Sequence, residues 1–153
     1  MTGWAQGAAD IEAFLAKRHL ERVTGARADG GPWLKKASQR LETAAAIVAY
    51  DPESAFVLAY DAARFVGEAL LAQQGLRPTQ AGGHVVVSDA VRAQFAGPFV
   101  ALNSLRRRRN ELEYPSFPGE QIDPDEVSSA IATARGQLAA AEKLLEHLGI
   151  FKP

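Results

Sequence analysis

The stretch PESAFVLAYDAARFVGEALLAQQ, residues 52–74, decides the fold, because apolar residues cover most of the circumference of a helix built from it. Its central line consists of small or branched apolar residues, namely Ala55, Ala59, Ala62, Val66 and Ala69. Between Glu53 and Gln74 only Asp61, Arg64 and Glu68 are strongly polar, at spacings that favour an ion-pair ladder along one face. The sequence therefore predicts a buried central helix that has helical partners on several sides.

Further helices are predicted on both sides of this segment. Asp51-Pro52, Gly97-Pro98 and Asp123-Pro124 each place a capping residue before a proline, an order typical of a first helical turn. Glu126 follows Asp123 by three residues, as in a capping box. Apolar residues then recur at steps of four and three until Gly149, at Val127, Ile131, Ala134, Leu138, Ala141, Leu145 and Leu148. This stripe predicts lengthwise packing against another helix.

Weaker amphipathic patterns predict the remaining helices. One begins near Leu34, a shorter one contains Ile11 and Phe14, and the triplet at 85–87 opens a pattern of helical period. No segment predicts a convincing strand. We therefore expect an all-α protein, an up-and-down antiparallel bundle of five to six helices. It forms a single domain over 1–153, with an N-terminal helical extension at 1–30 and a core bundle at 33–149.

Composition narrows the classes of function. The net charge of −1 gives the protein no overall basic face, so any contact with a nucleic acid must be local. The chain has no cysteine, and its three histidines lack the spacing of metal ligands. We accordingly expect no metal and no cofactor. No apolar run is long enough for a membrane span and the start lacks a signal-peptide pattern, so a cytoplasmic protein is expected.

The candidate functional segment is LRRRRNELEYP, residues 105–115. Four adjacent guanidiniums repel one another unless carboxylates or an anionic ligand lie nearby. One interpretation is a solvated helix over 98–113 on which Arg107 pairs with Glu111 and Arg109 with Glu113. A helix that continues to Tyr114 would place Arg107, Asn110 and Tyr114 on one face and Arg109 on another. Pro115 relaxes this restriction, so Tyr114 could fold back towards Arg107, Arg108 or Arg109.

These residues resemble the HEPN domain superfamily of small helical, often dimeric proteins associated with nucleotides and RNA. YDAARFVGEALLAQQGLRP at 60–78 is similar to a core helix and the loop after it, and AGGHVVVSDAV at 81–91 is similar to the next segment. The family motif is an arginine, then a polar residue, then a histidine four to six positions after the arginine. Arg109 and Asn110 match its first two positions, and Tyr114 stands where the histidine is expected.

The resemblance implies a homodimer whose arginine helices line a symmetric cleft. It also implies binding of RNA or nucleotide phosphate, in a bacterial toxin–antitoxin, defence or stress system. Arg109, Asn110 and Tyr114 take the catalytic positions of a metal-independent endoribonuclease. Because an ordinary tyrosine pKa is about 10, proton transfer is weakened or lost where Tyr114 replaces histidine.

Other residues extend the expected phosphate site. Arg106, Arg107 and Arg108 are further phosphate ligands, and His84, after Gly82 and Gly83 at a helix start, could replace the missing histidine in space. The alternative is a non-catalytic helical module for protein–protein interaction, whose arginines are satisfied by its own glutamates or by a partner's acidic surface. A third hypothesis is partnership with a cognate antitoxin or a nucleotidyltransferase.

Overall fold

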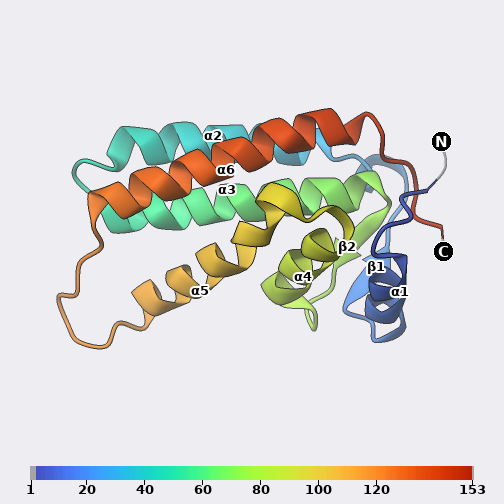
Figure 1. Ribbon diagram of the computed structural model, residues 1–153, viewed down its shortest axis with the longest axis horizontal. Coiled ribbons are helices and arrows are strands. Elements are labelled where there is room, and N and C mark those ends of the chain that lie inside the picture. Colours follow the sequence, from blue (N-terminus) through green and yellow to red (C-terminus); the bar gives the residue numbers. More distant parts are fainter. Residues whose placement is uncertain (1–2, 153) are drawn as a thin grey trace.

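The computed structural model describes residues 3–152, so residues 1–2 and 153 of the expected domain lie outside the described part. The described chain is an all-α bundle with one very small sheet, which confirms the predicted fold class. Three long helices lie side by side in Figure 1, namely α2 (Gly31–Ile47), α3 (Pro52–Gln73) and α6 (Pro124–Leu145). Helix α3 is the central one, because it packs on both α2 and α6.

Three shorter helices complete the bundle. Helices α4 (Gly83–Phe95) and α5 (Ala101–Glu113) pack on α3, and α1 (Ala8–Ala16) packs on α4. Along the chain α3 returns beside α2, α5 runs back again, and α6 follows the direction of α3 (Figure 1). Within residues 3–152 no helix combines the length and apolar character that a membrane span requires.

The helix starts marked by proline are confirmed at two of three positions. The Asp51 carboxylate accepts a hydrogen bond from the Ser54 N–H at 3.1 Å, and the Asp123 carboxylate accepts one from the Asp125 N–H at 2.9 Å. Gly97-Pro98 instead opens a 3-10 turn, η2 (Gly97–Val100), and α5 begins only at Ala101. The turn buries Phe99 against the bundle before the α-helix starts. The arginine helix is therefore three residues shorter than the predicted 98–113.

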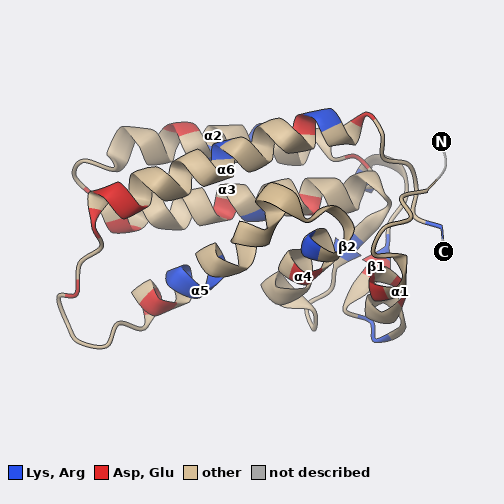
Figure 2. Ribbon diagram, viewed as in Figure 1, with Lys and Arg blue, Asp and Glu red and all other residues tan. Residues whose placement is uncertain are grey.

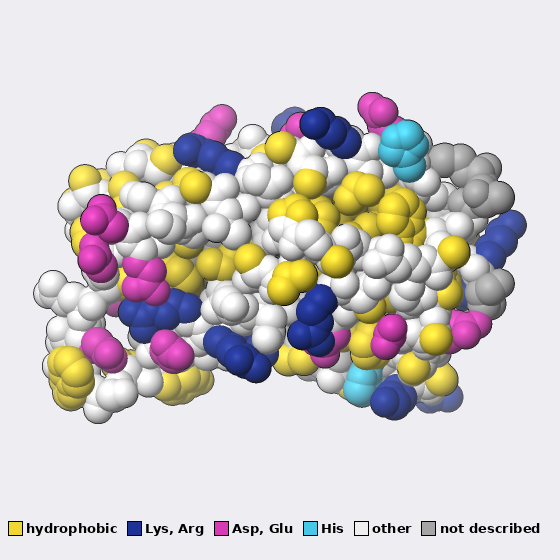
Figure 3. Space-filling view, viewed as in Figure 1, with side chains coloured by type: hydrophobic (Ala, Val, Ile, Leu, Met, Phe, Trp, Pro, Cys, Tyr) yellow, Lys and Arg dark blue, Asp and Glu magenta, His cyan; other side chains and the backbone are white. Residues whose placement is uncertain are grey.

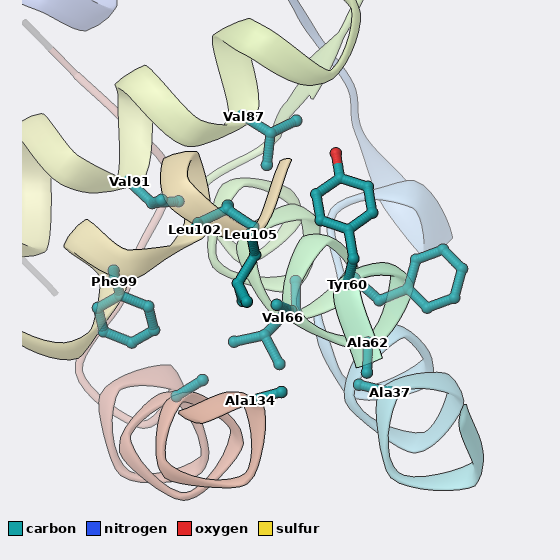
Figure 4. Packing of buried hydrophobic residues seen from close by; sticks show 14 of the residues in the cluster. Ala37, Tyr60, Ala62, Val66, Val87, Val91, Phe99, Leu102, Leu105 and Ala134 are labelled. Carbon is teal, nitrogen blue, oxygen red and sulfur yellow. The ribbon is translucent and has the colours of Figure 1, made fainter. Parts of the chain in front are cut away.

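The core surrounds α3 as the sequence predicts. Ala55, Ala59, Ala62, Val66 and Ala69 are all fully buried. The small residues allow close approach of the neighbouring helices: a Cβ added at Gly67 would lie 2.7 Å from the Val87 side chain of α4. Figure 4 shows the resulting cluster, with Val66 from α3, Val87 and Val91 from α4, and Leu102 and Leu105 from α5 pointing towards one another.

The predicted stripe on α6 also lies against the core. Val127, Ile131, Ala134 and Ala141 are buried, and α6 packs on α3 and α2. The helix ends at Leu145, four residues before the predicted stop at Gly149. Leu148 is still buried, but from the segment that follows the helix.

The expectation of no strand is wrong. Strand β1 (Leu20–Arg22) pairs antiparallel with β2 (Leu76–Pro78), in a register that places Glu21 opposite Arg77. Three residues are too few to show an alternating pattern, so neither strand was detectable from sequence. The pairing ties the N-terminal segment to the bundle, and Ile11 and Leu20 are fully buried. Residues 3–30 are thus a mixed segment, with α1, β1 and the 3-10 helix η1 (Gly25–Arg27), rather than a purely helical extension.

Candidate functional site

The four arginines of α5 point in different directions. Leu102, Arg106 and Arg109 recur at steps of four and three, so the two arginines share the side of α5 that carries the buried Leu102. Arg107 is exposed, as are Asn110 and Tyr114, the residues expected on its face. Figure 2 marks basic residues on both α5 and α3, together with acidic residues on the same two helices. Arg106 and Arg109 are therefore the two arginines of the run that lie on the inner side of α5.

Carboxylates satisfy part of the arginine run. Arg109 donates to Glu113 at 2.9 Å, which confirms that predicted pair. The predicted pair of Arg107 with Glu111 is wrong, because Glu111 accepts from Arg108 at 3.1 Å. Arg107 makes no ion pair with any residue of the described chain. Basic and acidic side chains lie next to one another over α5, at the lower left of Figure 3.

Arg108 joins α5 to α6. Its Nε donates to Glu126 at 2.7 Å, while Nη1 donates to Glu111. Glu126 thus accepts from Arg108 instead of closing the predicted capping box at Asp123, since α5 brings a guanidinium to the start of α6. These contacts raise the pKa of Arg108, chiefly through its hydrogen bond to Glu126. Arg108 therefore holds α5 and α6 together.

A third inward arginine comes from α3. Arg64 donates to Glu68 at 2.8 Å and lies 4.0 Å from Asp61, which confirms the predicted ion-pair ladder. Its side chain is only 16% exposed and that of Glu68 only 11%. Burial raises the pKa of Glu68, and the charges of Arg64 and Lys36 oppose this shift. The charge of Arg64 is thus balanced mainly by one partly desolvated carboxylate.

Tyr60, one turn before Arg64, connects α3 to the start of α4. Its ring is buried, and in Figure 4 its hydroxyl points out of the core cluster beside Val87. The hydroxyl lies 3.0 Å from Nδ1 of His84, the second residue of α4. The loop before α4 approaches the residue before β1 so closely that a Cβ at Gly82 would clash with the His19 carbonyl oxygen. His84 is therefore held at a fixed place while part of its ring stays exposed.

Three arginines influence the pKa values of both members of this pair. Burial lowers the pKa of His84, and the positive charges of Arg64, Arg109 and Arg106 lower it further, against the opposing charge of Asp61. Burial likewise raises the pKa of Tyr60 to about 12, although the same three arginines oppose the shift. Guanidiniums from two helices thus act on one imidazole and one phenol. We call Arg64, Arg106 and Arg109 the arginine cluster.

The arginine cluster keeps unused hydrogen-bond donors. Arg106 donates from Nη2 to Asn103 at 2.9 Å, and the other two arginines donate from Nη1 to their glutamates. The Nε atoms of all three are buried and have no hydrogen-bond partner among the described residues. Buried donors are normally paired, so three orphans on neighbouring cations mark the cluster as unsatisfied. An oxyanion that binds the remaining Nη atoms would balance the charge and give each guanidinium a second hydrogen bond.

The catalytic positions expected from the family motif are not grouped around this cluster as a set. Arg109 belongs to it, but the Tyr114 side chain is 80% exposed at the end of α5. Neither Tyr114 nor the exposed Asn110 uses its side chain in a hydrogen bond within the described chain. Arg106 and His84, two of the expected phosphate ligands, lie with Arg109, whereas Arg107 and Arg108 do not.

Sequence reasoning missed Tyr60 as a partner of His84. It favoured an ion-pair ladder for Arg64 and gave a pocket-lining role, on a face that meets a dimer partner, as the alternative. A signal was present in the sequence, because Tyr60, Arg64 and Glu68 follow one another at intervals of four residues. This spacing places all three on one face of α3. No group of three or more histidine, aspartate or glutamate side chains that could hold a metal ion lies within residues 3–152. Comparison of the chain with family models, with curated proteins and with solved structures found no match.

Proposed function

We propose that this chain is a HEPN-like protein that binds the phosphates of RNA or of a nucleotide at the arginine cluster. The observation that carries the proposal is the set of guanidiniums on Arg64, Arg106 and Arg109, each of which uses one nitrogen in a hydrogen bond and leaves a buried Nε without a partner. Phosphate offers several acceptor oxygens and the opposite charge, and arginine binds it through a planar fork. The near-zero net charge restricts this binding to a local site.

His84 is proposed as a fourth ligand, in its neutral form. The raised pKa of Tyr60 keeps its hydroxyl protonated, so it can donate to Nδ1 of His84. A neutral imidazole that accepts at Nδ1 carries its proton on Nε2. That N–H is then available to a phosphate oxygen, without a fourth positive charge among the three guanidiniums.

We expect binding without cleavage. To accept the ribose 2′-hydroxyl proton, His84 would need an unprotonated ring nitrogen that faces the RNA. Its Nδ1 is unprotonated but faces Tyr60, and its Nε2 already carries a proton in this tautomer. Tyr114, which takes the position of the motif histidine, is exposed. RNA incubated with the protein in EDTA should therefore stay intact. Cleavage that Arg109→Ala abolishes would contradict this expectation and identify a metal-independent ribonuclease.

Binding is tested with a fluorescently labelled single-stranded RNA and the variant Arg109→Ala. Hydrogen bonds to a charged group contribute about 1.5–3 kcal/mol, so the dissociation constant should rise by roughly ten- to a hundredfold. The matched control is Arg107→Ala, which removes the same charge from the same helix at an exposed position. Equal affinities for wild type and Arg109→Ala would exclude the arginine cluster as the phosphate site.

The ion pairs of α5 favour a second candidate function, a non-catalytic interaction module. Arg108 and Arg109 are paired with glutamates, as a structural role for the run requires. This candidate predicts no affinity for RNA, nucleotide or phosphate. The homodimer and the antitoxin or nucleotidyltransferase partner also remain predictions. Light scattering of the purified chain would measure its oligomeric state.

A further inference from the structure

A cavity of about 550 Å³ lies at the end of α3, and Glu68, the ion-pair partner of Arg64, is part of its wall. Its walls come from α2, α3, β1, β2, η1 and the loop after β2, and include Trp33, Glu68, Ala72, Leu76, Thr79 and Gln80. Sites for small organic ligands typically measure roughly 300–1,000 Å³ and combine apolar walls with a few polar groups. The cavity therefore has the size and the lining of a small-molecule site.

Two connections join the cavity to the arginine cluster. Glu68 lines the cavity, and the same carboxylate accepts from Arg64 of the cluster at 2.8 Å. Thr79 also lines the cavity, and its hydroxyl accepts from the Gly82 N–H at 3.2 Å, two residues before His84. One ligand could thus reach from the cavity to the arginines along α3.

Among the polar groups of the cavity, Glu68 offers a nearly buried acceptor to a ligand. Glu21 and Arg77 form an ion pair with each other across the small sheet, which neutralises that wall. Glu68 uses one carboxylate oxygen for Arg64, while its other oxygen makes no hydrogen bond within the described chain. That oxygen can accept from an N–H group.

Trp33 gives the cavity an aromatic wall. The residue is half-buried, and its ring lies 5.5 Å from that of Phe65, which restricts its orientation. Aromatic side chains bind nucleobases by stacking, which contributes about 1–3 kcal/mol for each base and tolerates different bases. An aromatic surface and a free carboxylate oxygen suit a nucleobase, and the cations next to Glu68 suit a phosphate.

We infer that this cavity holds the nucleobase of the nucleotide whose phosphate the arginine cluster binds, with Trp33 as the stacking surface and Glu68 as acceptor from the base edge. The inference rests on the proposed function, because the cluster supplies the phosphate contact. It adds a base pocket to that site. The preferred ligand is then a nucleotide or single-stranded RNA rather than a bare anion, since a base paired in a duplex could not enter.

The test uses the full chain labelled with 5-fluorotryptophan and observed by fluorine NMR. The chain has two tryptophans, and Trp33→Phe assigns the Trp33 signal. Trp4 is an internal control, because its indole donates to the Gln94 carbonyl oxygen at 2.7 Å, away from the cavity lining. We expect AMP and, at higher concentration, adenosine to shift the Trp33 signal and leave the Trp4 signal in place. Inorganic phosphate should bind without the Trp33 shift that adenosine produces.

Variants separate this inference from the proposed function. Trp33→Leu keeps an apolar side chain and removes the aromatic face, so RNA affinity should fall roughly tenfold or more, while Trp33→Phe retains most of it. Suppose that Arg109→Ala weakens RNA binding, but that Trp33→Leu binds RNA as tightly as wild type and the nucleotide leaves the Trp33 signal unshifted. The base pocket is then excluded and the phosphate site stands. If Arg109→Ala binds RNA as tightly as wild type, the proposed function fails and this inference fails with it. Thermal unfolding checks that each variant is folded.

Discussion

Two clusters of polar side chains lie inside this small protein, and they differ in how far their hydrogen bonds are satisfied. Gln74 and Gln94 are both fully buried and donate to each other's side-chain oxygens at 2.9 and 2.8 Å. Trp4 donates to the Gln94 backbone and Phe151 to the Gln74 backbone, so the glutamine pair ties both chain ends to the bundle. In the arginine cluster, by contrast, three buried Nε atoms have no partner in the described chain.

This difference separates a structural network from a site prepared for a ligand. A satisfied buried network stabilises one packing, and removal of one member leaves the other unpaired. An unsatisfied cluster of like charges costs stability, which binding of an anion would offset. Substitutions in the two clusters should therefore affect different properties. Changes in the glutamine pair should lower stability, and changes in the arginine cluster should weaken binding.

The largest effect on stability is expected for Gln94→Leu. It leaves the Gln74 amide buried without its side-chain partner, so the free energy of unfolding should fall by about 1–3 kcal/mol. Urea denaturation measures the loss. In the double variant Gln74→Leu/Gln94→Leu neither buried side-chain amide remains, and we expect it to be more stable than Gln94→Leu alone. A double variant as unstable as the sum of the two single variants would show that the network itself contributes little.

A smaller effect is expected for Arg108→Ala. This change removes the contacts of Arg108 with Glu126 and Glu111, which join α5 to α6. Surface ion pairs contribute up to about 1 kcal/mol each, so the free energy of unfolding should fall by about that amount in low salt, and by less in 1 M NaCl. RNA affinity should change much less than in Arg109→Ala. A large loss of affinity would place Arg108 in the phosphate site.

For Arg109→Ala the stability should be nearly unchanged, within about 0.5 kcal/mol. The variant loses a partly exposed pair with Glu113, and it also loses repulsion from Arg64 and Arg106. Urea denaturation beside Arg108→Ala tests the contrast between two adjacent arginines. A loss as large as that of Gln94→Leu would mean that the arginine cluster is a structural network, and would favour the interaction module.

The parts of the fold and of the candidate site that the sequence predicts are those that depend on residues close together in the chain. The starts of α3 and α6 depend on an aspartate and a proline that are adjacent in sequence, so local patterns were enough. The strands pair residues more than fifty positions apart, and each has only three residues. The division of the arginine run into faces follows from helical geometry. The inward face is the one that carries the buried Leu102. That Arg64 and Tyr60 of another helix meet this face is information that no local pattern carries.

The smallest expected effect is a pH dependence that distinguishes a free arginine cluster from an occupied one. Burial and the charges of Arg64, Arg109 and Arg106 lower the pKa of His84 below its ordinary value of 6.5, against the opposing charge of Asp61. Between the lowered value and 6.5 the unfolded chain binds more protons than the folded one. The free energy of unfolding should therefore decrease as the pH falls below 6.5, and should level off below the folded-state pKa.

Urea denaturation at several pH values should show this slope in wild type and a flatter curve in His84→Gln. A bound phosphate changes the sign of the nearby field, because its negative charge favours the imidazolium. The NMR titration midpoint of His84, assigned through His84→Gln, should thus rise when RNA is added. The Gln74–Gln94 pair has no titratable group and cannot produce such a shift. A midpoint that RNA leaves unchanged, under conditions where RNA binds, would place the phosphate away from His84 and from the arginines that surround it.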